Sequence, residues 1–252
     1  MKKAILFTSV LTMAGALLAA DSPKDALTAA ANKLAASDNY TWTTTPANPA
    51  GGGGGRGGGR GGFGGGPVEG KTEKGGYTLI SMTMGDNTSM TVLKGTNGAI
   101  KLPDGGWQSF AEASADDGNG GFTPGRFMVM RMQNSPTPAA DVLALIGQLG
   151  DVTVADGVYS GALTEDGAKA RLSFGPRGGF PGGGNGPEIT GAKGSAKFWI
   201  TDGVLTKYEL NVQGNINFNG NGRDMNRTTT TEIKDIGKTK VEAPDDAKKK
   251  IS

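Results

Sequence analysis

Apolar residues recur at helical spacing in two stretches of the chain. The first stretch places Leu27, Ala30, Ala31 and Leu34 on one face, and the second does the same with Val142, Leu145, Ile146 and Leu149. Each stretch follows a Ser or Thr that can cap a helix and a Pro that suits the first helical turn. The sequence therefore predicts amphipathic helices over residues 23–36 and 138–149, each with an apolar face to bury.

Elsewhere, apolar and polar residues alternate with the period of two that is typical of strands. The segments predicted as strands are 40–44, 77–84, 89–94, 99–102, 107–111, 126–132, 152–155, 158–163, 195–201, 204–213 and 227–233. Tight-turn sequences separate several of them, and Asp202-Gly203 is a strong hairpin signal. A third, short helix is predicted to start at Thr164 and to end near Arg171. Short strands joined by tight turns favour an antiparallel sheet, so the predicted class is α+β.

Methionines gather on the predicted sheet. If 126–132 is a strand, Met128, Met130 and Met132 share one of its faces. Methionine is unbranched and polarizable, so it adapts to ligands of varied shape. The residues predicted to line a ligand cavity are Ile80, Met82, Met84, Met128, Met130, Met132, Leu143 and Ile146. The alternative is a core that is filled with methionine.

Two glycine-rich tracts interrupt the pattern, at 47–70 and 175–190. Such segments bury too little to offset the entropy of ordering their backbone, so we expect flexible, disordered loops inserted between strands. Arg56, Arg60 and Arg177 within them are typical of RNA-binding Arg-Gly-Gly segments. Three arginines make a weak charge, and we therefore favour loops without nucleic acid.

The first twenty residues have the order of an export signal: basic Lys2-Lys3, an apolar run, then small residues up to Ala20. Cleavage near Ala20 would leave a single domain over residues 21–252 in the periplasm or outside the cell. Without Lys2 and Lys3 the basic residues equal the 24 acidic ones. A neutral chain offers no broad field for nucleic acid, and we expect at most peripheral contact with a membrane.

The chain contains no Cys and no His. This composition excludes disulfides, Ser-His-Asp and Cys-His catalytic sites, and zinc sites built on these residues. We therefore expect neither an enzyme nor a resident metal or cofactor. Without a Cys after the signal, lipid anchoring of the bacterial kind is not expected either.

The order of the predicted elements resembles a known family. A capped helix leads into Tyr40-Thr41-Trp42, the second helix precedes Val152-Thr153-Val154, and a late strand precedes Asp235-Ile236-Gly237. In this order the chain resembles the LolA/LolB/LppX-like superfamily of periplasmic lipoprotein and lipid carriers. The resemblance implies an open antiparallel half-barrel whose open side is covered by helices around an acyl-binding cavity. The glycine tracts, and the missing Cys that anchors LolB-like and LppX-like members, depart from that pattern.

Together these observations predict a soluble envelope protein that binds a hydrophobic ligand, such as a lipid or the acyl chain of a lipidated protein. The acyl chain of the ligand would lie between the methionine-bearing sheet and the helices 23–36 and 138–149. The alternative is a structural or interaction protein that uses its glycine-rich loops to contact a partner in the envelope. The oligomeric state stays open.

Overall fold

The computed structural model describes residues 22–47, 66–84, 86–103, 105–115, 124–133, 135–173, 187–218 and 220–251. Its helices are α1 (Pro23–Ala36), α2 (Phe110–Ser114), α3 (Pro124–Gln133), α4 (Pro138–Gly147), α5 (Glu165–Leu172) and α6 (Asp245–Ile251). Its strands are β1 (Asn39–Ala47), β2 (Val68–Glu73), β3 (Thr78–Met84), β4 (Asn87–Lys94), β5 (Asn97–Lys101), β6 (Trp107–Ser109), β7 (Leu149–Ala155), β8 (Val158–Leu163), β9 (Glu188–Thr201), β10 (Val204–Phe218) and β11 (Asn221–Lys234). The predicted export signal lies outside the described residues.

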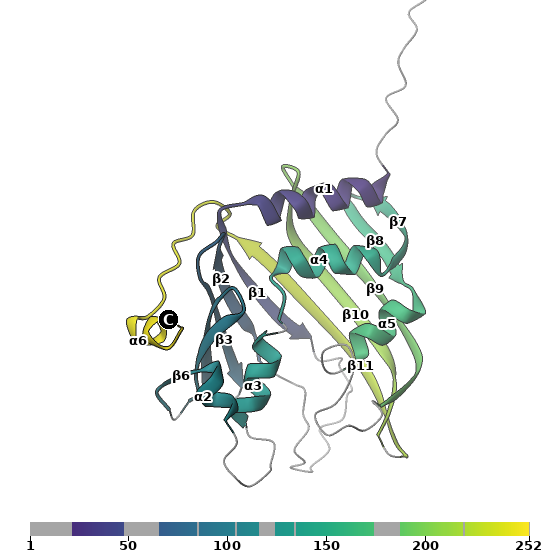
Figure 1. Ribbon diagram of the computed structural model, residues 1–252. Helices are drawn as coiled ribbons and strands as arrows, with labels where there is room; N and C mark the ends of the chain where they lie inside the picture. Colours follow the sequence, from purple (N-terminus) through teal and green to yellow (C-terminus); the bar gives the residue numbers. More distant parts are fainter. Residues whose placement is uncertain are drawn as a thin grey trace, which may run out of the picture.

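All described strands join one sheet in the order β6-β5-β4-β3-β2-β1-β11-β10-β9-β8-β7. Every pairing is antiparallel, and the edge strands β6 and β7 do not pair with each other. The sheet curls around the helices without closing (Figure 1). The predicted α+β class and the open half-barrel are confirmed.

The helices divide the inner face of the sheet into two covered parts. Helices α1 and α5 pack on β7–β10, with α4 beside α1, while α2 and α3 lie near β5 (Figure 1). No described helix packs its backbone closely on the central strands β1 and β11. Side chains nevertheless cover much of these two strands, because Tyr40, Trp42, Thr231 and Ile233 are buried.

Helix α1 forms as the sequence predicts. The Ser22 hydroxyl caps it by accepting from the Asp25 amide at 3.2 Å, and Pro23 occupies its first turn. The four residues of the predicted apolar face, Leu27, Ala30, Ala31 and Leu34, are all buried. Helix α4 has the predicted apolar face but ends at Gly147, because Leu149 already pairs with Leu163 at the start of β7.

The Asp202-Gly203 hairpin between β9 and β10 is also confirmed. Both residues adopt positive φ, 52° at Asp202 and 71° at Gly203. This is the geometry of a two-residue turn that matches the twist of the flanking strands. The short third helix is confirmed as α5, which begins after the Thr164 cap.

The strand predicted at 126–132 is wrong, because these residues form helix α3. Three of its apolar residues, Met128, Val129 and Met132, are buried together. Their spacing of one and four residues suits one helical face, whereas in a strand Val129 would point away from Met128 and Met132. Pro124 at the first position and the good helix formers Met and Arg favour the helix.

The strand predicted at 107–111 is wrong in its second half. Strand β6 ends at Ser109, and α2 begins at Phe110. Ser109 and Glu112 form a reciprocal capping box: the Ser109 amide donates to Glu112 Oε2 at 2.7 Å, and the Glu112 amide donates to Ser109 Oγ at 3.1 Å. This pair is a start signal for a helix.

Both glycine-rich segments were predicted too long. Most of each lies outside the described residues, but residues 68–70 belong to β2 and residues 188–190 to β9. Gly70 lies directly beneath the Trp42 ring, where a Cβ would come within 2.0 Å of the ring. Val68 and Ile189 pack against the core. Ladder bonds and burial therefore order these ends, which composition alone marks as loops.

A second, smaller core lies on the outer face. The chain after β11 crosses to β4–β6, where α6 packs (Figure 1). Ala243 and Ala247 are buried there against Val92 and Ala99. Acidic residues in its first turn and lysines in its last turn suit the helix dipole.

Candidate functional site

Cross-strand register gives the inner face an apolar part and a polar part. One row runs from Tyr208 through Thr231 and Thr44 to Val68 and Met82. Strands lie about 4.8 Å apart, so this row changes from hydroxyl to apolar side chains within a few strand spacings. The apolar end lies on β2 and β3, and the polar end on β1 and β11, where Thr231 is buried and Thr44 is half-buried.

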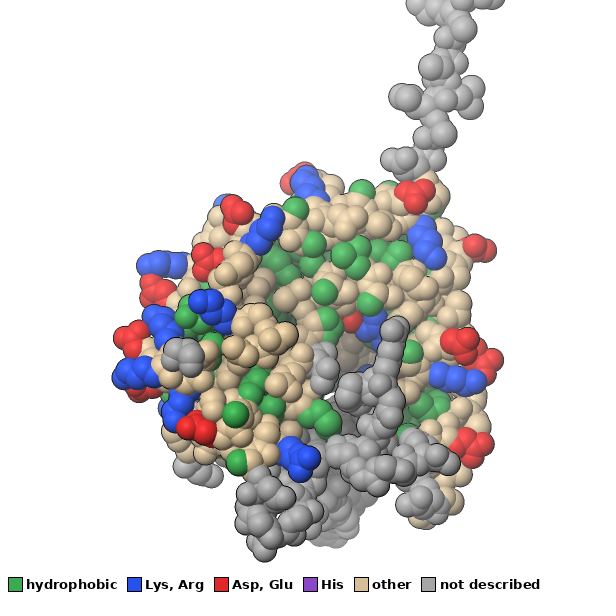
Figure 2. Space-filling model, viewed as in Figure 1, with side chains coloured by type: hydrophobic (Ala, Val, Ile, Leu, Met, Phe, Trp, Pro, Cys, Tyr) green, Lys and Arg blue, Asp and Glu red, His purple; other side chains and the backbone are tan. Residues whose placement is uncertain are grey.

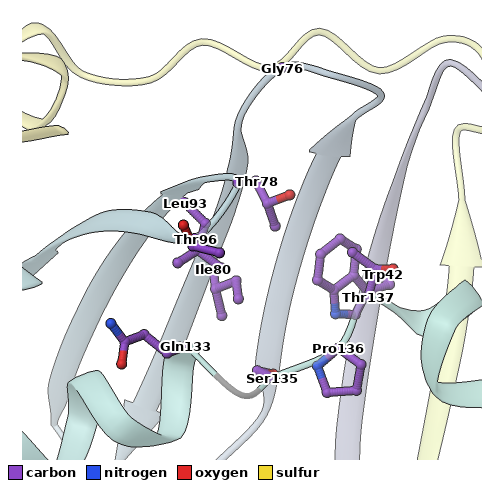
Figure 3. Close-up of a pocket in the computed structure, with 11 residues that line it drawn as sticks. Trp42, Gly76, Thr78, Ile80, Leu93, Thr96, Gln133, Ser135, Pro136 and Thr137 are labelled. Atoms are coloured by element: carbon purple, nitrogen blue, oxygen red, sulfur yellow. The ribbon is translucent and has the colours of Figure 1, made fainter. Parts of the chain in front are cut away.

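A cavity of about 170 Å³ opens at the upper end of the apolar part (Figure 3). The Trp42 ring, Ile80 and Leu93 supply its apolar surface from β1, β3 and β4. The linker between α3 and α4 supplies the opposite wall. Its lining residues are Trp42, Gly76, Thr78, Ile80, Leu93, Gly95, Thr96, Gln133, Ser135, Pro136 and Thr137.

The size of this cavity limits what it holds without rearrangement. Pockets for drug-sized ligands measure roughly 300–1,000 Å³, whereas a cavity near 150 Å³ holds a benzene-sized molecule. A long acyl chain therefore needs more room than the cavity provides. Exposed residues occur on both sides of the cavity, at Ser135 and Pro136 of the α3–α4 linker and at Gly95 and Thr96 of the β4–β5 turn.

The linker is fastened at its α4 end. The Tyr40 hydroxyl hydrogen-bonds with Thr137 and the backbone of Ala139. Burial raises the pKa of Tyr40, and these hydrogen bonds partly offset the rise.

The structure spreads the eight predicted cavity residues over the inner core. Ile80 lines the cavity. Met82, Met128, Met132 and Ile146 are buried in the main core, and Leu143 packs against it. Met130 on α3 is half-buried, and the Met84 side chain is not among the described ones. The prediction that they jointly line one cavity is not tested by the geometry and remains a proposal.

Asp141 is the centre of a hydrogen-bond network between α4, α5 and the sheet. Its carboxylate accepts from the Arg171 guanidinium and, at 2.9 Å, from the Tyr208 hydroxyl. Arg171 Nε also donates to Gln148 Oε1 at 2.6 Å. The Arg171 and Asp141 side chains are only 17% and 18% exposed. Burial, and then the Asp141 charge, raise the pKa of Tyr208 well above its ordinary value.

Two further arginines lie near this network. Arg227 on β11 shares the inner face with Thr231 and donates through its Nη2 to the Arg171 carbonyl at 3.3 Å. Burial, and then the charges of Arg131 and Arg171, lower the pKa of Arg227. Burial also lowers the pKa of Arg131, which is on α3 and open to solvent. Arg131 is therefore partly desolvated although its side chain reaches solvent.

Figure 2 shows that this face of the molecule is hollowed below α4, with basic and acidic side chains inside the hollow. The sequence analysis did not single out Asp141, Arg131, Arg171 or Arg227. The sequence does hold a signal for Arg227. Arg227, Thr229, Thr231 and the buried Ile233 are each two residues apart, so they share one face of the strand. Period-two alternation thus places an arginine on the core face.

Within the described ranges, no group of three or more Asp and Glu residues could hold a metal ion. Of the helices in those ranges, none has the length and apolar character that crossing a bilayer requires.

No protein-family profile and no curated protein match the chain. Solved structures do. The lipoprotein LppX of Mycobacterium tuberculosis has 11% identity and a TM-score of 0.45 over 87% of this chain and 97% of its own. LprF of Mycobacterium bovis has 13% identity and a TM-score of 0.43 over 89% and 97%. The predicted resemblance to LppX-like proteins is thus confirmed as a similarity in the arrangement of helices and strands.

Proposed function

We propose that this protein binds a hydrophobic ligand between the inner face of its sheet and helices α3 and α4. The observation that carries the proposal is the cavity between Trp42, Ile80 and Leu93 on the sheet and the α3–α4 linker. An aromatic and aliphatic surface of this kind favours an apolar chain over a polar solute. The proposal concerns binding, because the chain has no Cys or His for the common catalytic sites.

Growth of the cavity is the step that admits a longer chain. In this proposal α3 moves away from the sheet, and the methionines of α3 and β3 repack along the ligand. Met128 and Met132 line the underside of α3, and Met82 follows Ile80 on the same face of β3. Unbranched side chains with three rotatable bonds suit such repacking.

The test is titration of the delipidated protein with straight-chain alcohols of increasing length. Each buried methylene contributes about 0.8 kcal/mol, so affinity should rise about four-fold for each added methylene until the site is full. Absence of saturable binding, or affinity that does not depend on length, would reject the proposal.

A cavity-blocking variant gives the matched control. Thr96 is exposed and lines the cavity, so Thr96→Trp should obstruct it and weaken binding of the alcohols. Thr153 is exposed on the edge strand β7, and Thr153→Trp should leave binding unchanged. Equal effects of the two variants would contradict the assignment of the site.

The place of action is part of the same proposal. The basic, apolar and small-residue order of residues 1–20 supports export with cleavage near Ala20. Mass measurement of the chain recovered from an expressing cell's envelope tests this: a mature N-terminus near Asp21 is expected. Recovery of the full-length chain from the cytoplasm alone would reject export.

A further inference from the structure

The inner face carries an excess of positive charge around Arg227 of β11. Arg131, Arg171 and Arg227 are close enough for their charges to repel. Of the described carboxylates, Asp141 is the one that pairs with any of them, and it is occupied by Arg171 and Tyr208. No described carboxylate pairs with Arg131 or Arg227. Guanidinium groups crowded into a concavity gain from any anion that enters it.

A structural role explains Arg171 fully and Arg227 in part. Arg171 ties α5 to α4 through Asp141 and Gln148. Arg227 donates one bond to the carbonyl of Arg171 in the last turn of α5, which is a favourable place for a cation. That bond uses one of the five N–H donors of a guanidinium. Arg131 has no such bond to explain its place, and its solvent exposure shows that the space before it is open.

The surroundings of the two arginines are amphipathic. On β11, Thr229 and Thr231 continue the inner-face row above Arg227. From Thr231 the cross-strand row passes through Thr44 to Val68 and Met82. On α3, Arg131 is flanked by Met130 and the buried Met132. Positive charge, then hydroxyls, then an apolar surface follow one another along a continuous face.

We infer that Arg131 and Arg227 bind the anionic head group, a carboxylate or phosphate, of an amphiphile whose apolar chain lies against β2, β3 and α3. This inference rests on the proposed function and adds a charge requirement to it. The head group lies beside Arg227, which is half-buried, and Arg131, which is exposed, so water reaches the site from the side of Arg131. Arg171 stays paired with Asp141, so it adds to the positive potential near the head group without binding it.

The experiment measures binding of dodecanoate, dodecyl phosphate and dodecanol to the full exported chain and to Arg131→Gln and Arg227→Gln. The wild-type protein should bind both anions at least ten-fold more tightly than the alcohol. Each variant should lose about ten-fold in affinity for the anions and keep its affinity for dodecanol. A higher salt concentration should weaken the binding of the two anions and leave the binding of dodecanol unchanged.

Two controls separate charge from folding. Lys71 is exposed on the outer face of β2, so Lys71→Gln removes the same charge away from the site and should change nothing. Arg227→Lys keeps the charge but not the planar fork, and it should recover part of the affinity. Because Arg131 is exposed, its glutamine variant should fold with an unchanged melting temperature.

Three results would overturn the inference, each in a different way. Equal affinity for dodecanoate and dodecanol, unchanged in both variants, would reject the head-group site while chain binding stands. Saturable binding of inorganic phosphate as tight as that of dodecyl phosphate would assign the arginines to a free anion. Failure of all three amphiphiles to bind would reject the proposed function itself.

Discussion

At the scale of single residues, the interior polar groups are the part of this protein that hydrophobic patterning hides. Asp141 lies on the same helix as the buried Val142 and Leu145, one residue from the first of them. Its side chain nevertheless meets Arg171 from α5 and Tyr208 from β10. Partners this distant in sequence leave no local signal, so their meeting follows only from the fold.

Asp141→Asn should lower the free energy of unfolding by about 2 kcal/mol. The change leaves the Arg171 guanidinium without a counter-charge in a largely shielded place, and such losses exceed those at the surface. Urea titration measures the effect. Asp151→Asn is the control, because Asp151 is exposed and its loss should cost almost nothing. Equal costs for the two variants would contradict a shielded ion pair.

Tyr208→Phe should flatten the loss of stability at high pH. The pKa of Tyr208 is raised well above 10.0 in the folded protein, so the unfolded chain loses this proton first. The contribution of Tyr208 to stability is therefore present below about pH 10 and is lost as pH rises from there to the folded pKa. The slope removed by the variant is at most about 1.4 kcal/mol per pH unit.

The same tyrosine can be followed spectroscopically. In Asp141→Asn the Tyr208 pKa should fall, because one of the causes that raise it is the Asp141 charge. It should stay above the ordinary value, since burial is the larger cause. An unchanged absorbance titration would show that Asp141 does not act on Tyr208.

At the scale of elements, the sequence predicts those whose ends and faces agree. Helix α1 has a cap, an N-terminal proline and one apolar face, and the Asp202-Gly203 hairpin has the turn that its strands need. Helix α3 was mistaken for a strand because alternate methionines satisfy a period of two, while Val129 joins them in burial only in a helix. Over only ten residues, a hydrophobic pattern fits the helical period of 3.6 and the strand period of two almost equally well.

The sequence predicts element boundaries wrongly where a local contact and the hydrophobic pattern indicate different structures. The Ser109 and Glu112 capping box ends β6 and starts α2, although apolar residues continue through the junction. At the glycine tracts the reverse holds, because Val68 and Ile189 extend the core into segments whose composition predicts loops. In both cases pairing and capping contacts decide the boundary, and these contacts depend on few residues.

Ala247→Asp should detach α6 from the outer face. Ala247 is 0% exposed against Val92 and Ala99, so an aspartate there buries a charge without a partner or displaces the helix. The expected cost is about 2–4 kcal/mol by urea titration. Ala140→Asp is the matched control, since Ala140 is exposed in the first turn of α4, where an acid suits the dipole. Equal costs would show that α6 does not seal this face.

At the scale of the whole molecule, one pairing joins the two ends of the chain. Thr44 on β1 and Thr231 on β11 share a hydrogen bond of 2.8 Å although 187 residues separate them. This pairing unites two antiparallel meanders, β1–β6 and β7–β11, into one sheet. Periodicity alone could not predict this pairing, because the pattern of apolar residues in a strand does not show which other strand it pairs with. The family resemblance supplied the open half-barrel instead.

The same union creates the proposed site, because the polar strip on β1 and β11 lies between the two parts of the inner face that the helices cover. A ligand that bridges them binds only the complete sheet, so binding must raise the stability of the whole molecule. At one hundred times its dissociation constant, dodecanoate should add about 2.7 kcal/mol to the free energy of unfolding. At the same dodecanoate concentration, Arg227→Gln should reduce that gain by about 1.3 kcal/mol for a ten-fold loss in affinity. Urea titrations with and without ligand measure both values, and a gain that is zero, or equal in the variant and the wild type, would separate the arginine strip from ligand binding.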